Sequence, residues 1–369
     1  MIEEERLVKS FMKYVQISSY SKEEKEFADF IKRELESLGF EIYIDRAGKK
    51  VGSNTGNIIA RLKGDSKREP ILFSCHLDTV APGKKIRPIK RDGKIVSDGS
   101  TILGADDKGG IAALIEALRV VKENNIEHGP IEVVLSICEE IGLLGVRNLE
   151  YNKLQSKRAY VIDSEGKPGK IVVQGPAHDD LEIKVLGKSA HAGIAPEKGI
   201  SAIQVAAHAI SKMNLLRIDA ETTANIGTIG GGEGTNVVAP EVFIRAEARS
   251  QDEKKLEKQV KHMIECLEQT AKEFGAKIEI KRDREYSSFQ IEEEDEIVQI
   301  VKKVCKNIGI EAYTQKSGGG SDTNTYNEHG IKAVNLATGE GNPHTKEEYI
   351  EIEDLVNMAR IIVEIIRLA

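Results

Sequence analysis

Short apolar segments alternate with stretches of helical periodicity through the first part of this chain, and this alternation limits its fold more than any other feature. Ile71–Asp78, Ile131–Ile137 and Ala159–Asp163 have the length and composition of buried strands. Phe27–Leu38 repeats apolar residues at helical spacing, and Gly104–Val121 indicates a loop that leads into a buried helix. Strands that alternate with helices predict an α/β domain with a largely parallel sheet covered by helices.

The pattern changes between about residue 179 and residue 290. The expected elements there are, in order, a strand at Leu181–Val185, a helix at Ile200–Met213, strands at Asn225–Ile229 and Val242–Ala248, a helix at Leu256–Phe274 and a strand at Ile278–Ile280. The order β-α-β-β-α-β is that of a ferredoxin-like unit. We therefore predict a larger domain made of residues 1–178 and 291–369, into which a smaller domain of residues 179–290 is inserted.

Composition argues against several classes of partner. The 369 residues include 53 Lys and Arg against 60 Asp and Glu, a net charge of −7, whereas nucleic-acid binding needs a positive surface. The four cysteines form no C-x-x-C pair, so neither a disulfide framework nor a zinc ribbon is indicated. Because we find no signal peptide and no apolar stretch of about 18 residues, we expect a cytoplasmic protein that binds neither nucleic acid nor membrane.

Acidic and histidine side chains stand where the predicted buried strands end or where the buried helix begins. They are His76, Asp78, Asp106, Glu139, Glu140 and Asp163, and His344 follows far downstream. Open α/β sheets bind ligands beyond the carboxyl ends of their strands, so we expect these side chains to share one site. Residues two apart on a strand point to the same face, which allows His76 and Asp78 to enter the site together.

Two histidines and several carboxylates form a ligand set suited to zinc, cobalt or manganese, and their number suits two ions. One arrangement places His76 and Asp163 on the first ion. Glu140 and His344 would then hold the second ion, and Asp106 would bridge the two. Two ions about 3.5–4 Å apart polarise a carbonyl group and lower the pKa of a shared water.

Two carboxylates are not metal ligands in this arrangement, and each could serve a different role in hydrolysis. Asp78 is two residues from His76 and could fix the orientation of its imidazole. Glu139 adjoins a ligand without being one, as a general base for the attacking water would. Each pattern alone also has an ordinary explanation, since Asp106 can cap a helix and Asp163 can begin a turn.

Four motifs carry a resemblance to a known family. They are Ser74–Val80, Gly104–Gly110, Glu139–Gly142 and Ser189–Gly193. Together, and in this order along nearly the whole chain, they resemble the di-zinc metallopeptidase family that includes glutamate carboxypeptidase, acetylornithine deacetylase and peptidase T. The Ala-Asp-Asp-Lys run and Asp163 bring the chain closest to the peptidase T-like branch.

The resemblance implies a catalytic domain with a zinc-aminopeptidase-like mixed sheet flanked by helices, and an inserted ferredoxin-like lid that serves dimerisation. It implies the same metal ligands as the spacing does, with Glu139 as the base and Asp78 as the orienting residue. An Asp at position 163 is commoner in the aminopeptidases of the family. We therefore expect a metal-dependent, tripeptidase-like exopeptidase for short peptides that uses a water bridged between two zinc ions. The alternatives are an N-acyl-amino-acid deacylase or a carboxypeptidase of the same family, and a metal-stabilised binding protein without turnover.

The resemblance also assigns substrate-binding roles within the lid. His191 matches a histidine that reaches across a dimer to the other copy's active site and helps to stabilise the oxyanion. Asn236 and Arg245 match residues that contact the substrate carboxylate or the oxyanion, and arginine suits a carboxylate through its bidentate fork. We therefore expect a homodimer that acts on a short peptide.

Overall fold

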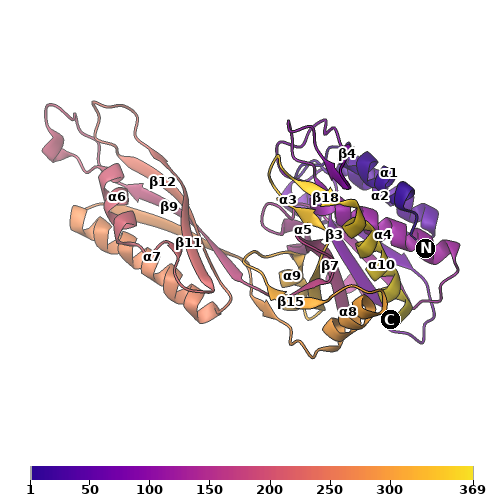
Figure 1. Ribbon diagram of the computed structural model, residues 1–369. Coiled ribbons are helices and arrows are strands. Elements are labelled where there is room, and N and C mark those ends of the chain that lie inside the picture. Colours follow the sequence, from indigo (N-terminus) through magenta and orange to yellow (C-terminus); the bar gives the residue numbers. More distant parts are fainter. Residues whose placement is uncertain (1, 369) are drawn as a thin grey trace. The chain divides into compact units, whose positions relative to one another are not determined.

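The computed structural model describes residues 2–368, which divide into two compact units (Figure 1). Unit 1 contains residues 2–174, 290–317 and 321–368, and unit 2 contains Gly175–Phe289 and Gly318–Gly320. Met1 and Ala369, the outer bounds of the predicted domains, lie outside the described residues. Each unit has a hydrophobic core of its own.

A nine-stranded mixed sheet forms the centre of unit 1, in the order β1-β2-β6-β3-β7-β16-β8-β14, with β15 paired to β8. Its strands are β1 (Glu41–Ile44), β2 (Ile58–Leu62), β3 (Ile71–His76), β6 (Ile131–Ser136), β7 (Arg158–Ser164), β8 (Lys170–Gly175), β14 (Phe289–Gln290), β15 (Tyr313–Lys316) and β16 (Lys332–Ala337). The inner strands β6, β3, β7 and β16 are parallel, whereas β1, β2 and β8 run antiparallel to neighbours. The predicted parallel sheet is therefore confirmed for these inner strands.

Helices cover both faces of this sheet. They are α1 (Glu4–Val15), α2 (Lys25–Leu38), α3 (Ala47–Val51), α4 (Ala105–Glu123), α5 (Leu144–Arg147), α8 (Glu296–Asn307), α9 (Asp322–Glu328) and α10 (Ile352–Leu368). Figure 1 shows α4 and α10 on one side of β3 and β7, and α9 on the other. A second, four-stranded sheet joins β17 (Glu340–Gly341), β18 (Tyr349–Glu351), β5 (Lys94–Val96) and β4 (Ile89–Arg91).

Helix α4 packs closely against the centre of the sheet because its first turns carry glycine. A Cβ atom at Gly110 would lie 2.4 Å from the carbonyl oxygen of Ile162 in β7. Most of α4 is buried, and it contacts β3 and β7 along one side and α1 and α10 along the other. This packing fixes the amino-terminal end of α4 beside the carboxyl ends of the parallel strands.

Unit 2 contains a five-stranded antiparallel sheet with two helices on one face. The strand order is β10 (Leu216–Arg217), β11 (Thr222–Gly231), β12 (Glu241–Ser250), β9 (Ala177–Leu186) and β13 (Lys277–Tyr286). The helices α6 (Ala202–Lys212) and α7 (Glu253–Phe274) bury the apolar residues that alternate along β9 and β12, such as Leu181 and Ile183. Each predicted element of the βαββαβ order is present, and the short strand β10 is added to it.

The structure thus confirms a mixed α/β fold whose central sheet is flanked by helices. That unit 2 acts as a lid stays a prediction. Among the described residues, no helix has the length and apolar character needed to cross a membrane.

Candidate active site

Several of the predicted site residues lie at the carboxyl ends of the inner parallel strands of unit 1. His76 is the last residue of β3, and Asp163 lies near the end of β7. Glu139 and Glu140 follow β6, which ends at Ser136, so they belong to a loop beyond the strand. Because β6, β3 and β7 are adjacent and parallel, these side chains come to one edge of the sheet.

Two histidines contact different oxygens of Asp106, which lies in the first turn of α4. His76 Nε2 is 2.8 Å from Asp106 Oδ1 and 3.3 Å from Asp163 Oδ1. His344 comes from the loop between β17 and β18, and its Nε2 is 3.2 Å from Asp106 Oδ2. The same nitrogen is 3.0 Å from Glu140 Oε1. Each histidine therefore has Asp106 and one further carboxylate beside it.

The spacing of these ligand atoms fits divalent cations. Ligands at 2.0–2.1 Å from a tetrahedral zinc ion are about 3.3–3.4 Å apart. The four contacts just described are 2.8–3.3 Å long. Imidazole nitrogens and carboxylate oxygens are also ligands that zinc, cobalt and manganese accept. This site could therefore hold two such ions, one beside each histidine.

The charge of the site supports the same conclusion. Burial raises the pKa of Asp163 to about 7, and burial followed by the charge of Asp163 raises the pKa of Glu139 well above its usual range. Burial also raises the pKa of Glu140. Hydrogen bonds to Asp106 and Glu140 raise the pKa of His344 to about 10. Negative charge thus predominates among the buried groups, and bound cations would reduce the repulsion between these carboxylates.

Asp78 fixes the loop that carries Glu139 and Glu140. Its carboxylate accepts hydrogen bonds from the Ser21 hydroxyl at 2.6 Å, from the Glu139 amide at 2.9 Å and from the Glu140 amide at 3.3 Å. His76 Nδ1 lies 2.9 Å from the main-chain oxygen of Asp78 and 3.6 Å from its carboxylate. Asp78 therefore contacts the predicted ligand His76 and the predicted base Glu139 at once.

Residues 72–368 match the family model described as peptidase family M20/M25/M40. The chain belongs to this family. Its whole length is similar to an aminopeptidase PepT structure from Bacillus cereus, with 45% identity, a TM-score of 0.90 and coverage of 99% of this chain and 98% of that one. A tripeptidase structure from Staphylococcus aureus is 40% identical, with a TM-score of 0.95 and coverage of 100% and 99%. Peptidase T from Listeria innocua is 27% identical over 416 residues, with coverage of 99% and 98%. These findings confirm the resemblance to the peptidase T-like branch.

In this member of the peptidase family, the site contains one more buried carboxylate, that of Asp107. The sequence alone offered no means of distinguishing its role from that of Asp106. Its Oδ2 accepts a hydrogen bond of 3.0 Å from the main-chain amide of His76. Ligand atoms of Asp107, His76 and Asp163 lie within 4.8 Å of one another. Two successive aspartates are equivalent in a sequence, and only the backbone conformation at the start of α4 distinguishes them.

Glu348 was also missed, because it stands in no motif. Its buried carboxylate accepts four main-chain hydrogen bonds of 2.6–3.1 Å, from the amides of Leu103, Gly104, Ala105 and Asp106. Three of them, from Gly104, Ala105 and Asp106, are free amides at the amino-terminal end of α4, and the fourth comes from the residue before the N-cap. Asp106 itself makes no capping hydrogen bond, since Gly104 is the N-cap residue and the anion comes from Glu348.

Asn335 in β16 holds the main chain of Asp163 and was likewise not selected from the sequence. Its side-chain oxygen accepts from the Asp163 amide at 3.0 Å, and its side-chain nitrogen donates to the Asp163 carbonyl oxygen at 3.1 Å. The same nitrogen donates to Ser321, the N-cap residue of α9, at 3.2 Å. A lone asparagine in a buried strand gives no signal of this role.

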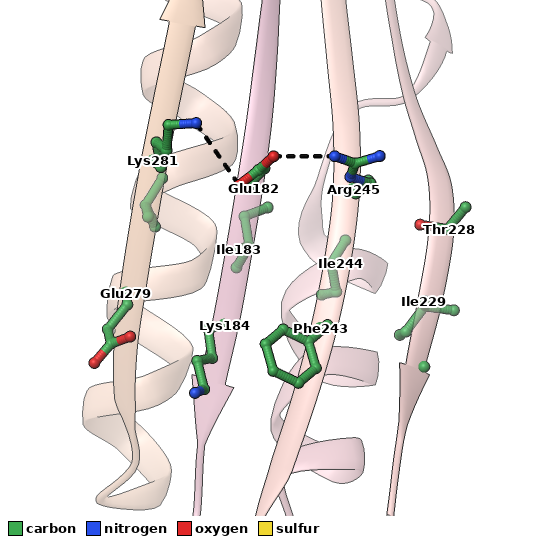
Figure 2. Close-up of a pocket in the computed structure, with 12 residues that line it drawn as sticks. Glu182, Ile183, Lys184, Thr228, Ile229, Phe243, Ile244, Arg245, Glu279 and Lys281 are labelled. Carbon is green, nitrogen blue, oxygen red and sulfur yellow. Dashed lines mark hydrogen bonds and ion pairs between the residues drawn. The ribbon is translucent and has the colours of Figure 1, made fainter. Parts of the chain in front are cut away.

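The three predicted substrate-binding residues lie in unit 2. His191 and Asn236 belong to adjacent loops, joined by a 2.9 Å hydrogen bond from the Ala192 amide to the Asn236 carbonyl oxygen. Arg245 lies on β12, where it pairs with Glu182 at 3.0 Å on the sheet face opposite the helices (Figure 2). There it lines a shallow groove of about 660 Å³. Their contact with substrate stays a prediction.

Proposed function

We propose that this chain is a metal-dependent exopeptidase that hydrolyses the amide bonds of short peptides and releases amino-terminal residues in the manner of a tripeptidase. The observation that carries the proposal is the pair of histidine–carboxylate clusters that share Asp106. The aminopeptidase and the tripeptidase to which the chain is 45% and 40% identical support the choice of substrate.

The five clustered side chains would hold two divalent ions, with zinc as our first choice of metal. His76 and Asp163 would bind one ion, and Glu140 and His344 would bind the other. Asp106 would contribute one oxygen to each. When bound, such ions polarise the scissile carbonyl group and lower the pKa of the attacking water.

Glu139 is the general base in this proposal. Its carboxylate takes a proton from the attacking water and passes it to the leaving amino group. Burial raises the pKa of Glu139, which suits a group that must both accept and return a proton near neutral pH. The hydrogen bond from its amide to Asp78 fixes the loop from which it acts.

A substrate panel tests the reaction. Zinc-loaded protein is offered tripeptides, dipeptides and N-acetyl amino acids, and we expect release of the amino-terminal residue of tripeptides. Cleavage confined to acylated amino acids would instead identify a deacylase, and release of the carboxyl-terminal residue would identify a carboxypeptidase. Absence of all cleavage with ions bound would favour a binding protein.

Substitution of the base tests its assignment separately. Glu139→Gln should reduce turnover by about 10²–10⁴-fold, the usual contribution of a positioned acid–base group, with the metal content unchanged. Glu127→Gln is the matched control, since Glu127 is exposed. Turnover retained by Glu139→Gln would remove Glu139 from this role.

We also propose that the active form is a homodimer in which unit 2 serves as the lid and His191 reaches the other copy. The exposed position of His191 on a loop of unit 2 allows such a contact. Sedimentation of active protein should give the mass of a dimer. Full activity in a monomer would refute this part of the proposal.

A further inference from the structure

We propose that unit 2 carries a separate binding site for a divalent transition-metal cation, made of His178, Asp180 and Glu247. His178 and Asp180 are two residues apart on β9 and point to the same face, and Glu247 stands directly opposite Asp180 on β12. His178 Nε2 is 3.2 Å from Asp180 Oδ1 and 3.3 Å from Glu247 Oε2. All three ligand atoms lie within 4.8 Å of one another.

The environment of the His178 side chain favours a bound cation. This side chain is only 10% exposed and packs edge-on against the ring of Tyr286, with 5.3 Å between ring centroids. Among the described residues, no group makes a well-directed hydrogen bond with its Nε2, although carboxylate oxygens of Asp180 and Glu247 lie close enough to interact with it electrostatically. A buried nitrogen without a hydrogen bond costs about 1–3 kcal/mol, and a bound cation would use its lone pair.

A row of acidic residues across the sheet also favours a bound cation. Glu247, Asp180 and Asp283 stand opposite one another on the adjacent strands β12, β9 and β13. Like charges directly opposite on neighbouring strands are destabilising. Arg249 offsets part of this repulsion at Glu247, and a cation between Glu247 and Asp180 would offset more of it and join β9 to β12.

Two basic side chains nearby are engaged outside the row, and a third, Arg249, is paired with Glu247 inside it. Arg245 and Lys281 both pair with Glu182, at 3.0 and 3.8 Å (Figure 2). Arg249 pairs with Glu247 at 2.8 Å. Within the described part of the chain, the carboxylate in the middle of the row therefore has only the imidazole at ion-pair distance.

The geometry and the ligand types suit zinc or a similar ion. Separations of 3.2 and 3.3 Å are close to the edge of a zinc tetrahedron, about 3.3–3.4 Å. One imidazole and two carboxylates leave the fourth position for water, and the hydrogen bonds from Arg249 would orient Glu247 as a ligand. The side chain of Asp180 is 51% exposed, so an ion can reach the site from solvent.

Metal counting tests the site in the full-length protein. Wild type, His178→Ala and Asp180→Asn are dialysed to equilibrium against micromolar free zinc, and bound zinc is measured by mass spectrometry. We expect each variant to bind one zinc fewer per chain than wild type. His208→Ala is the control, because His208 is an exposed histidine of the same unit, on α6, and it should match wild type.

The difference between wild type and variant is the measured quantity, so the result does not depend on what the site in unit 1 binds. Asp180→Asn keeps the size of a half-exposed side chain, and circular dichroism checks that both variants are folded. Equal zinc content in wild type and in folded variants would overturn the proposal. So would a loss of stability in His178→Ala with no loss of zinc, which would show that the imidazole stabilises the sheet without a cation.

Discussion

Replacement of Glu348 by glutamine tests whether one buried carboxylate holds the loop that presents Asp106. Oε2 accepts from the amides of Leu103 and Gly104, and Oε1 accepts from those of Ala105 and Asp106. Glutamine keeps one acceptor oxygen and turns the other position into a donor. Two buried amides then lose their acceptor, at about 1–3 kcal/mol each, so the free energy of unfolding should fall by about 2–6 kcal/mol.

The assay is urea unfolding followed by circular dichroism in the presence of a chelator, which removes any contribution from bound metal. Burial raises the pKa of Glu348 to about 7, so the measurement is made above that pH, where the wild-type group is ionised. Glu347→Gln is the matched control, because Glu347 is the exposed neighbour and should change stability by less than about 0.5 kcal/mol.

A second measurement connects Glu348 to the site. One of its four hydrogen bonds comes from the amide of Asp106 itself. Glu348→Gln should therefore also retain metal less well than Glu347→Gln when both are dialysed against a chelator. Equal unfolding free energies in the two variants would refute the view that this carboxylate stabilises the start of α4.

Three further predictions follow from the buried groups of unit 1. Asn335→Ala removes both hydrogen bonds to the main chain of Asp163, so it should lower the free energy of unfolding by about 2–3 kcal/mol and weaken metal retention; unchanged retention in dialysis would contradict this role. Burial lowers the pKa of Lys108 to about 7 from 10.5; the folded state then binds fewer protons than the unfolded state between these pH values, and the stability that this group contributes is lost as the pH falls towards 7. Lys108→Met should flatten the rise of wild-type stability across that window, and identical pH profiles from urea unfolding would count against it. Removal of bound metal by a chelator should lower the thermal midpoint, because Asp106 then repels the buried carboxylates of Asp163 and Glu140 without shielding; calorimetry that finds the same midpoint after verified metal loss would contradict the proposed metal site.

The secondary structure was largely predictable because it depends on local burial. The predicted strand Ile131–Ile137 is β6 (Ile131–Ser136), and the predicted helix Phe27–Leu38 is α2 (Lys25–Leu38). Gly39 ends α2 in the left-handed conformation, with φ 101°, which glycine adopts without steric cost. Period-two and period-3.6 patterns arise within a few residues and need no knowledge of distant contacts.

Only the fold could show whether Asp106 serves as a helix cap. The N-cap position belongs to Gly104, and the anion at that helix end is Glu348, which bonds to an amide 242 residues away in the sequence. Asn335 contacts Asp163 across 172 residues in the same way. Neither contact leaves a periodic or short-range trace in the sequence.

The sequence by itself determined which side chains follow the ends of buried strands, and so which histidines and carboxylates belong to one edge of the sheet. The tertiary structure decided how far apart these side chains lie. It did so through the strand order, the parallel pairing of β6, β3 and β7, and the close packing of α4. They brought His344 to Asp106 Oδ2 and His76 to Asp106 Oδ1. The physical reason is that ligand distances are set by the tertiary packing of segments far apart in the chain, whereas the strands and helices that carry the ligands form according to local patterns of burial.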